Sequence, residues 1–195
     1  EILKQRPHSI DLAKHYATLA FNKGLHEKTI SLLESQNIEY DGNDYGLLIL
    51  SYYHLGKPRI ALDYLRDGES KILEDRPQNI AFLFCVGSEL AEKQMEEELA
   101  SRYINLVKDF ENGEAVLAIN SFIFNSNQNP DLREQYCEQL YAEYQRLGKP
   151  VEIAEQLFGY LNPTEINQAQ RICELAECIL SSHELFEKDY FRLAQ

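Results

Sequence analysis

The chain has 195 residues and a formal net charge of −13 at pH 7, from 19 Lys and Arg against 32 Asp and Glu. Its hydrophobic content of 44% and charged content of 26% are those of an ordinary globular domain, which excludes low-complexity disorder and a collagen-like fibre. A protein that binds nucleic acid needs a basic footprint, so the acidic balance argues against that class of partner.

Apolar residues recur three and four positions apart along most of the chain, as in the stretch from Leu12 to Ala20, and this spacing predicts helices. Alternation with a period of two, which would indicate strands, is absent. The expected helices cover residues 9–23, 26–36, 43–55, 58–67, 79–92, 94–110, 113–125, 130–147, 150–161, 163–181 and 183–194. Their short connections predict antiparallel packing of successive helices.

Three glycines mark an internal repeat of helical hairpins. Gly24 and Gly56 are 32 residues apart, and Gly148 follows Gly56 by 92 residues, close to three such periods. In each copy a glycine ends one helix and permits a tight turn into the next. A small residue then lets the second helix approach the first closely.

The second copy carries the clearest family signature. Its large, aromatic, glycine, alanine and large positions are occupied by Leu48, Tyr52, Gly56, Ala61 and Leu65. In this order the residues resemble a tetratricopeptide repeat (TPR). The first copy keeps Ala17, Gly24 and Leu33 but has Ala20 for the aromatic residue and Thr29 for the alanine, and the last keeps Tyr144 with Ala154 displaced by one.

The resemblance is good over residues 9–67, fair over 130–161 and weak elsewhere. It implies an all-α fold, a right-handed α-solenoid of antiparallel hairpins with about 10–11 helices, forming a single domain over residues 1–195. Residues 163–195 would supply C-terminal helices that could cap the solenoid. Because the sequence starts at Glu1 rather than at methionine, we expect the parent protein to be longer.

No catalytic or metal-binding motif emerges. Phosphate-binding glycine loops, nucleophile elbows and H-E-x-x-H are absent, and the five histidines are scattered. The run from Glu96 to Glu98 is interpreted as a solvated helix face, and the four cysteines, none in a C-x-x-C pair, as reduced packing residues. We therefore expect a non-enzymatic protein without cofactor or metal.

In a stacked solenoid, the first helix of each hairpin lines a concave groove that binds a protein or peptide. The resemblance places on that surface Lys14, Thr18, Phe21, Asn22, Leu50, Tyr53, His54, Gln145 and Arg146. The expected function is that of an adaptor within a larger complex. An equally weighted alternative is that these residues pack against other parts of the full-length protein.

The charge of the chain bears on the partner. TPR domains that clamp an acidic C-terminus use a Lys, present here as Lys14, together with asparagines at positions that Thr18 and Leu47 occupy. These departures and the net acidity favour a basic or apolar partner over an acidic one. Tyr136 and Tyr141 are further candidates for surface anchors.

Two other functions are compatible with the sequence. Self-association as a homodimer would use the apolar residues of the last predicted helix, Leu185, Phe186, Tyr190, Phe191 and Leu193. An all-α enzyme or small-molecule sensor is the least favoured alternative. No apolar run approaches the roughly 20 residues that cross a membrane, and no signal-peptide pattern is present, so we expect no membrane insertion and a cytoplasmic location.

Overall fold

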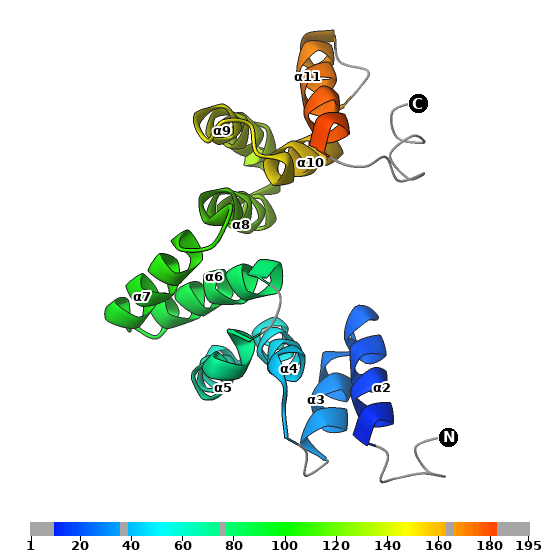
Figure 1. Ribbon diagram of the computed structural model, residues 1–195, viewed down its shortest axis with the longest axis vertical. Helices are drawn as coiled ribbons and strands as arrows, with labels where there is room; N and C mark the ends of the chain where they lie inside the picture. Colours follow the sequence, from blue (N-terminus) through cyan, green and yellow to red (C-terminus); the bar gives the residue numbers. More distant parts are fainter. Residues whose placement is uncertain (1–9, 36–38, 75–76, 163–165, 183–195) are drawn as a thin grey trace. The chain divides into compact units, whose positions relative to one another are not determined.

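The computed structural model describes residues 10–35, 39–74, 77–162 and 166–182 (Figure 1). Within these ranges the chain is all-α, as predicted, and contains no strand. The α-helices are α2 (Ile10–Asn22), α3 (His26–Glu34), α4 (Gly42–His54), α5 (Pro58–Ile72), α6 (Pro77–Lys93), α7 (Glu97–Lys108), α8 (Gly113–Gln128), α9 (Arg133–Arg146), α10 (Val151–Tyr160) and α11 (Ile166–Ser182), and a 3-10 helix η1 (Pro130–Leu132) precedes α9.

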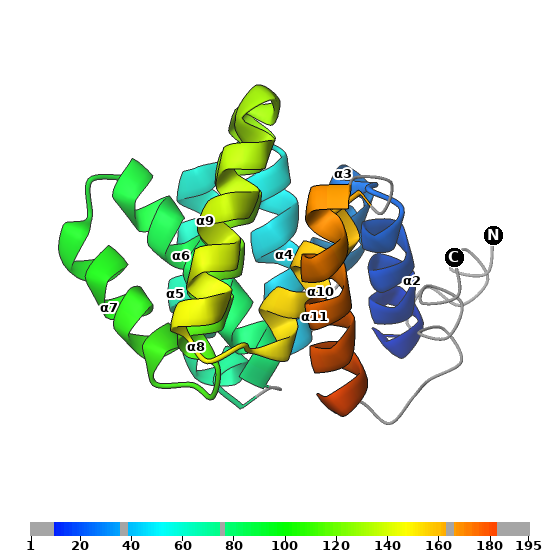
Figure 2. The same cartoon turned by 90° about the horizontal axis from the view of Figure 1, so that it is seen from above.

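The chain divides into two compact units, residues 1–107 and 108–195. In the first unit α2 packs on α3, α3 on α4, α4 on α5 and α5 on α6, and α2 also contacts α4 (Figure 2). In the second unit α10 packs against α8, α9 and α11. A single continuous solenoid domain over residues 1–195 stays a prediction.

Four turns between helices share one backbone geometry. At Gly24, Gly56 and Gly148, φ is 70°, 67° and 79°, in the left-handed region that glycine adopts without strain. The next residue donates its N–H to a carbonyl five positions earlier, at 2.8–2.9 Å. The fourth turn joins α6 to α7 with Met95 at φ 60°, and Glu96 N–H donates to the Ala91 carbonyl at 2.9 Å. The α6–α7 pair is therefore a hairpin of the same kind, which the glycine spacing did not reveal.

Small residues let the helices of the first unit approach closely. Thr29 of α3 donates its hydroxyl to the Ala17 carbonyl of α2 at 3.4 Å, and Ser88 of α6 donates to the Ala100 carbonyl of α7 at 3.1 Å. A Cβ on Gly87 would stand 2.2 Å from a methyl carbon of Leu65. These close approaches account for the small residues at hairpin positions.

The second unit has its own apolar core. Tyr144 of α9, Ile153, Ala154 and Leu157 of α10 and Leu175 of α11 are all almost completely buried in it. The sequence placed Tyr144, Ala154 and Leu157 at packing positions, and the structure buries all three.

Several helix bounds differ from those predicted. Helix α5 continues through Gly68 to Ile72 instead of ending at residue 67, because the Tyr45 ring of α4 packs directly on the glycine. Helix α8 runs to Gln128, three residues past the predicted end, and α9 begins at Arg133 after the 3-10 turn. The predicted helix over residues 183–194 lies outside the described residues. None of the described helices has the length and apolar content needed to cross a membrane.

Candidate functional site

Lys14 is one of the predicted groove residues, and its charge is engaged within the chain. Its Nζ forms ion pairs with Asp41, at 2.8 Å, and with Asp44. These two aspartates form the capping box at the start of α4, each carboxylate accepting an N–H from the other residue's backbone. Burial alone would lower the pKa of Lys14, but its hydrogen bonds to both carboxylates raise it. Lys14 therefore ties α2 to the first turn of α4.

At the opposite end of α2 and α4, four rings stand in sequence, and we call Phe21, His26, His54 and Tyr53 the ring row. The Phe21 and His26 centroids are 5.5 Å apart at an edge-to-face angle of 69°. The His26 and His54 rings are stacked, with centroids 4.6 Å apart, and His54 meets Tyr53 edge to face at 5.6 Å. The row thus connects the end of α2, the start of α3 and the end of α4.

The row continues onto α6 through polar contacts. The Tyr53 hydroxyl donates to both carboxylate oxygens of Glu89, at 3.0 and 3.2 Å. Burial and the Glu89 charge raise the pKa of this phenol to about 12, so Tyr53 stays a neutral donor. The Lys93 Nζ lies 5.7 Å from the centroid of the Tyr53 ring and also pairs with Glu89. A cation is therefore already accommodated over one ring of the row.

The two imidazoles form the centre of the row. Burial and the neighbouring His26 lower the pKa of His54, so its ring is neutral at physiological pH. The Nδ1 atom of His26 is buried and has no hydrogen-bond partner among the described residues. His54 is exposed, while Phe21, His26 and Tyr53 are half-buried. The row therefore offers ring surface to solvent, mainly at His54.

The remaining predicted residues of the first unit lie around this row. Thr18 donates its hydroxyl to the Lys14 carbonyl one turn earlier, at 3.2 Å. Asn22 is exposed beside Phe21 at the end of α2, and Leu50 is half-buried one turn before His54. The structure thus joins Phe21, Tyr53 and His54 into one surface and gives Lys14 and Thr18 local bonds within the unit.

Gln145 and Arg146 belong to the second unit. Gln145 donates to Glu174 of α11 at 2.9 Å and to the Tyr141 hydroxyl at 3.0 Å. Tyr141 is half-buried and donates its own hydroxyl to Glu174 at 2.6 Å. Gln145 and Tyr141 therefore take part in the contact between α9 and α11.

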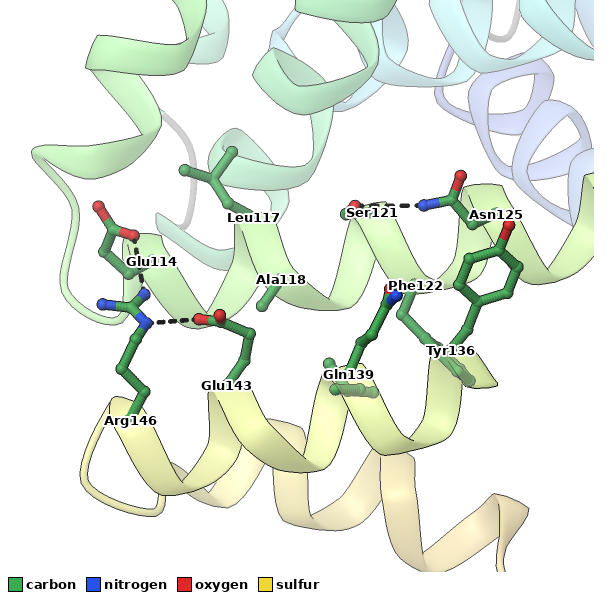
Figure 3. A pocket seen from close by; sticks show the side chains of 11 residues that line it. Glu114, Leu117, Ala118, Ser121, Phe122, Asn125, Tyr136, Gln139, Glu143 and Arg146 are labelled. Atoms are coloured by element: carbon green, nitrogen blue, oxygen red, sulfur yellow. Dashed lines mark hydrogen bonds and ion pairs between the residues drawn. The ribbon is translucent and has the colours of Figure 1, made fainter. Parts of the chain in front are cut away.

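Arg146 lies at one end of a groove between α8 and α9, which we call the α8–α9 groove (Figure 3). Its guanidinium pairs with Glu143 at 2.7 Å and with Glu114 of α8 at 3.6 Å. The groove has a volume of about 430 Å³ and an apolar floor that includes Phe122 and Leu140. Tyr136 stands at its other end, so this predicted surface anchor does line a cavity.

Two further features of the described residues bear on metal binding and on nucleophilic chemistry. No group of three or more His, Cys, Asp or Glu side chains suited to a metal ion occurs among the described residues. Cys85, Cys137, Cys173 and Cys178 are free thiols, and burial raises the pKa of the Cys85 thiol to about 12. Such a thiol is a poor nucleophile at neutral pH.

The sequence did not reveal His26 or Glu89 as members of this surface. His26 lies at the start of a second helix, and Glu89 lies in a segment where the repeat pattern is weak. A repeat aligned on Met95 would have assigned Glu89 and Lys93 to the same face as Tyr53 and His54.

No family model matches the chain, and neither a curated protein nor a solved structure shows significant similarity to it. The likeness to tetratricopeptide repeats therefore rests on the residues of the hairpins themselves.

Proposed function

We propose that this chain is a non-enzymatic protein-interaction module, built as a TPR-like solenoid, whose first unit binds a partner protein through the ring row. The observation that carries the proposal is the continuous contact of Phe21, His26, His54 and Tyr53 across three helices. Aromatic residues give large contact area at a small entropic cost, which makes them frequent binding anchors. Because helix packing already holds these rings, binding would order few of the receptor's side chains.

The surroundings of the row indicate the chemistry of the partner. The row lies where α2 and α4 end and α3 begins, so the partial negative charges of two helix C-termini meet the partial positive charge of one helix N-terminus. Glu89 adds a carboxylate, which pairs with Lys93, and the whole chain has a net charge of −13. A segment with an apolar side chain and a nearby Lys or Arg would fit this surface, with its cation over a ring.

The test replaces one end ring and one central ring of the row. Phe21→Ala with His54→Ala removes ring area and leaves the Tyr53–Glu89 hydrogen bond intact. Ile60→Ala, on the exposed face of α5, is the matched control, because its side chain is 41% exposed. Proteins captured from a native lysate are quantified for each variant, after circular dichroism has shown equal helix content.

We expect a partner captured by the native chain and by Ile60→Ala to be lost with the double variant. Equal capture by all three proteins would contradict the proposal and move the interface to another surface. The cytoplasmic location expected from the sequence belongs to the same proposal. Self-association stays an alternative whose apolar residues, between Leu185 and Leu193, lie outside those the structure describes.

A further inference from the structure

The second unit carries a surface of its own that the proposed function does not use. The α8–α9 groove extends along α8 from Glu114 to Asn125 and along α9 from Tyr136 to Arg146 (Figure 3). Eleven residues of helix rise about 16 Å, which equals the length of about five residues of extended chain. The groove volume of about 430 Å³ suits such a segment better than a whole helix.

The floor of the groove is apolar and well supported. Phe122 and Leu140 form part of it and are only 4% and 2% exposed, because they also belong to the core of the second unit. Ala118 of α8 also lines the groove, and its short side chain fills little of the space between α8 and α9. The apolar surface open to a ligand therefore comes mainly from Leu117, Ala118 and Tyr136, which line the groove and are half-buried.

The walls offer neutral hydrogen-bonding groups and, at one end, net negative charge. Ser121 and Asn125 of α8 and Gln139 of α9 can pair with the backbone of an extended segment. At the other end two carboxylates, Glu114 and Glu143, share the single guanidinium of Arg146, which leaves one negative charge. The second unit as a whole has 7 Lys and Arg against 15 Asp and Glu, a net charge of −8.

We propose that the α8–α9 groove binds an extended, basic segment of a partner protein. An apolar side chain of this segment rests on the floor at Ala118, and a Lys or Arg two residues away reaches Glu114 and Glu143. This surface is separate from the ring row, so binding of a segment in the groove does not depend on binding of a partner at the row.

The probes are capped pentapeptides with serine at every position except the second and fourth. The first has leucine and lysine there, the second leucine and glutamate, and the third serine and lysine. Each is titrated into the ¹⁵N-labelled full chain at physiological salt, and amide shifts are mapped along the sequence. We expect the leucine–lysine peptide to shift amides of α8 and α9. It should bind about tenfold more tightly than either other peptide, because it alone combines an apolar side chain with a charge opposite to those of Glu114 and Glu143.

Variants locate the contact. Ala118→Leu fills the floor and should abolish the shifts, whereas Ala142→Leu, the same change at an exposed position of α9, should leave them unchanged. Glu114→Gln combined with Glu143→Gln should remove the preference for lysine over glutamate. Retained binding in Ala118→Leu, equal binding of the lysine and glutamate peptides, or the absence of shifts in α8 and α9 would each overturn the proposal. A groove filled by a second copy of the chain, visible as a dimer in sedimentation that Ala118→Leu dissociates, would also overturn it.

Discussion

Met95 shows at the scale of one residue how a turn can be kept after its glycine is lost. Its φ of 60° matches the glycines of the three similar turns, and its side chain is 91% exposed, so no packing compensates for the conformation. A left-handed conformation costs a residue with a side chain about 1–2 kcal/mol. The α6–α7 hairpin therefore tolerates local strain that the turns at Gly24 and Gly56 avoid, and the turn at Gly148 carries a similar strain at Lys149, whose φ is 67°.

Met95→Gly should increase the free energy of unfolding by about 0.5–1 kcal/mol, because the relief of strain exceeds the extra chain entropy of glycine. Urea unfolding followed by circular dichroism measures this difference. The matched change is Gly56→Ala, which introduces the same strain at φ 67° and should lower the free energy of unfolding. An unchanged or lower stability of Met95→Gly would contradict the assignment of strain to this turn.

Gly68 illustrates the opposite case, in which a glycine is required inside a helix. A Cβ at this position would stand 2.3 Å from the Tyr45 ring. That ring is held by Tyr40 and Tyr64, whose centroids lie 5.5 and 6.5 Å away. The ring cannot move aside without disturbing the whole tyrosine cluster.

Gly68→Ala should therefore lower the free energy of unfolding by about 1–3 kcal/mol, as expected for overpacking. Gly159→Ala provides the comparison, because no atom lies within 4 Å of the Cβ it would add to α10. That change should stabilise the chain by about 0.5–1 kcal/mol through the better helix propensity of alanine. Thermal or urea unfolding measures the stability of both variants. An unchanged free energy of unfolding in Gly68→Ala would contradict the close approach of the Tyr45 ring to Gly68.

At the scale of elements, Glu174 joins α11 to α9. Its carboxylate accepts hydrogen bonds from Lys149 at 2.6 Å, Tyr141 at 2.6 Å and Gln145 at 2.9 Å. The Lys149 hydrogen bond, followed by those of Tyr141 and Gln145, lowers the pKa of Glu174 to about 2. Because the folded carboxyl has the lower pKa, its stabilisation is complete above the ordinary value of 4.5 and is lost as the pH falls toward 2.

Glu174→Gln should therefore be less stable than the native chain at pH 6, and the difference should shrink as the pH falls below 4.5. Unfolding by urea at a series of pH values between 6 and 3 measures the two stabilities. A difference that stays constant over this range would show that the carboxylate charge does not support the α9–α11 contact.

The hairpins could be predicted from the sequence to the extent that their local signals are intact. Gly24, Gly56 and Gly148 end helices as expected, and apolar spacing identified every described α-helix. The α6–α7 hairpin escaped detection as a repeat because Met95 replaces the glycine. The ion pairs of Lys14 and the stacking of His26 on His54 depend on residues brought together only by packing between hairpins, which no local pattern encodes.

At the scale of the whole molecule, both compact units are acidic. Each carries one of the two proposed binding surfaces, the ring row in the first unit and the α8–α9 groove in the second. The first unit has 12 Lys and Arg against 17 Asp and Glu, a net charge of −5, and the second has a net charge of −8. Acidity in both units favours basic partners and speeds their encounter at low ionic strength. Partner capture should therefore weaken as salt is raised, while ring contacts maintain part of the affinity.

Site-specific photo-crosslinking tests the central claim most directly. A benzophenone amino acid replaces exposed Asn22, beside the ring row, or, in a separate protein, Ile60 on α5. After irradiation in native lysate, the crosslinked proteins are identified by mass spectrometry. The account predicts a defined partner crosslinked from position 22, absent from position 60, and lost when Phe21→Ala and His54→Ala are added. A partner that crosslinks from position 60 instead, or that survives the loss of both rings, would contradict it.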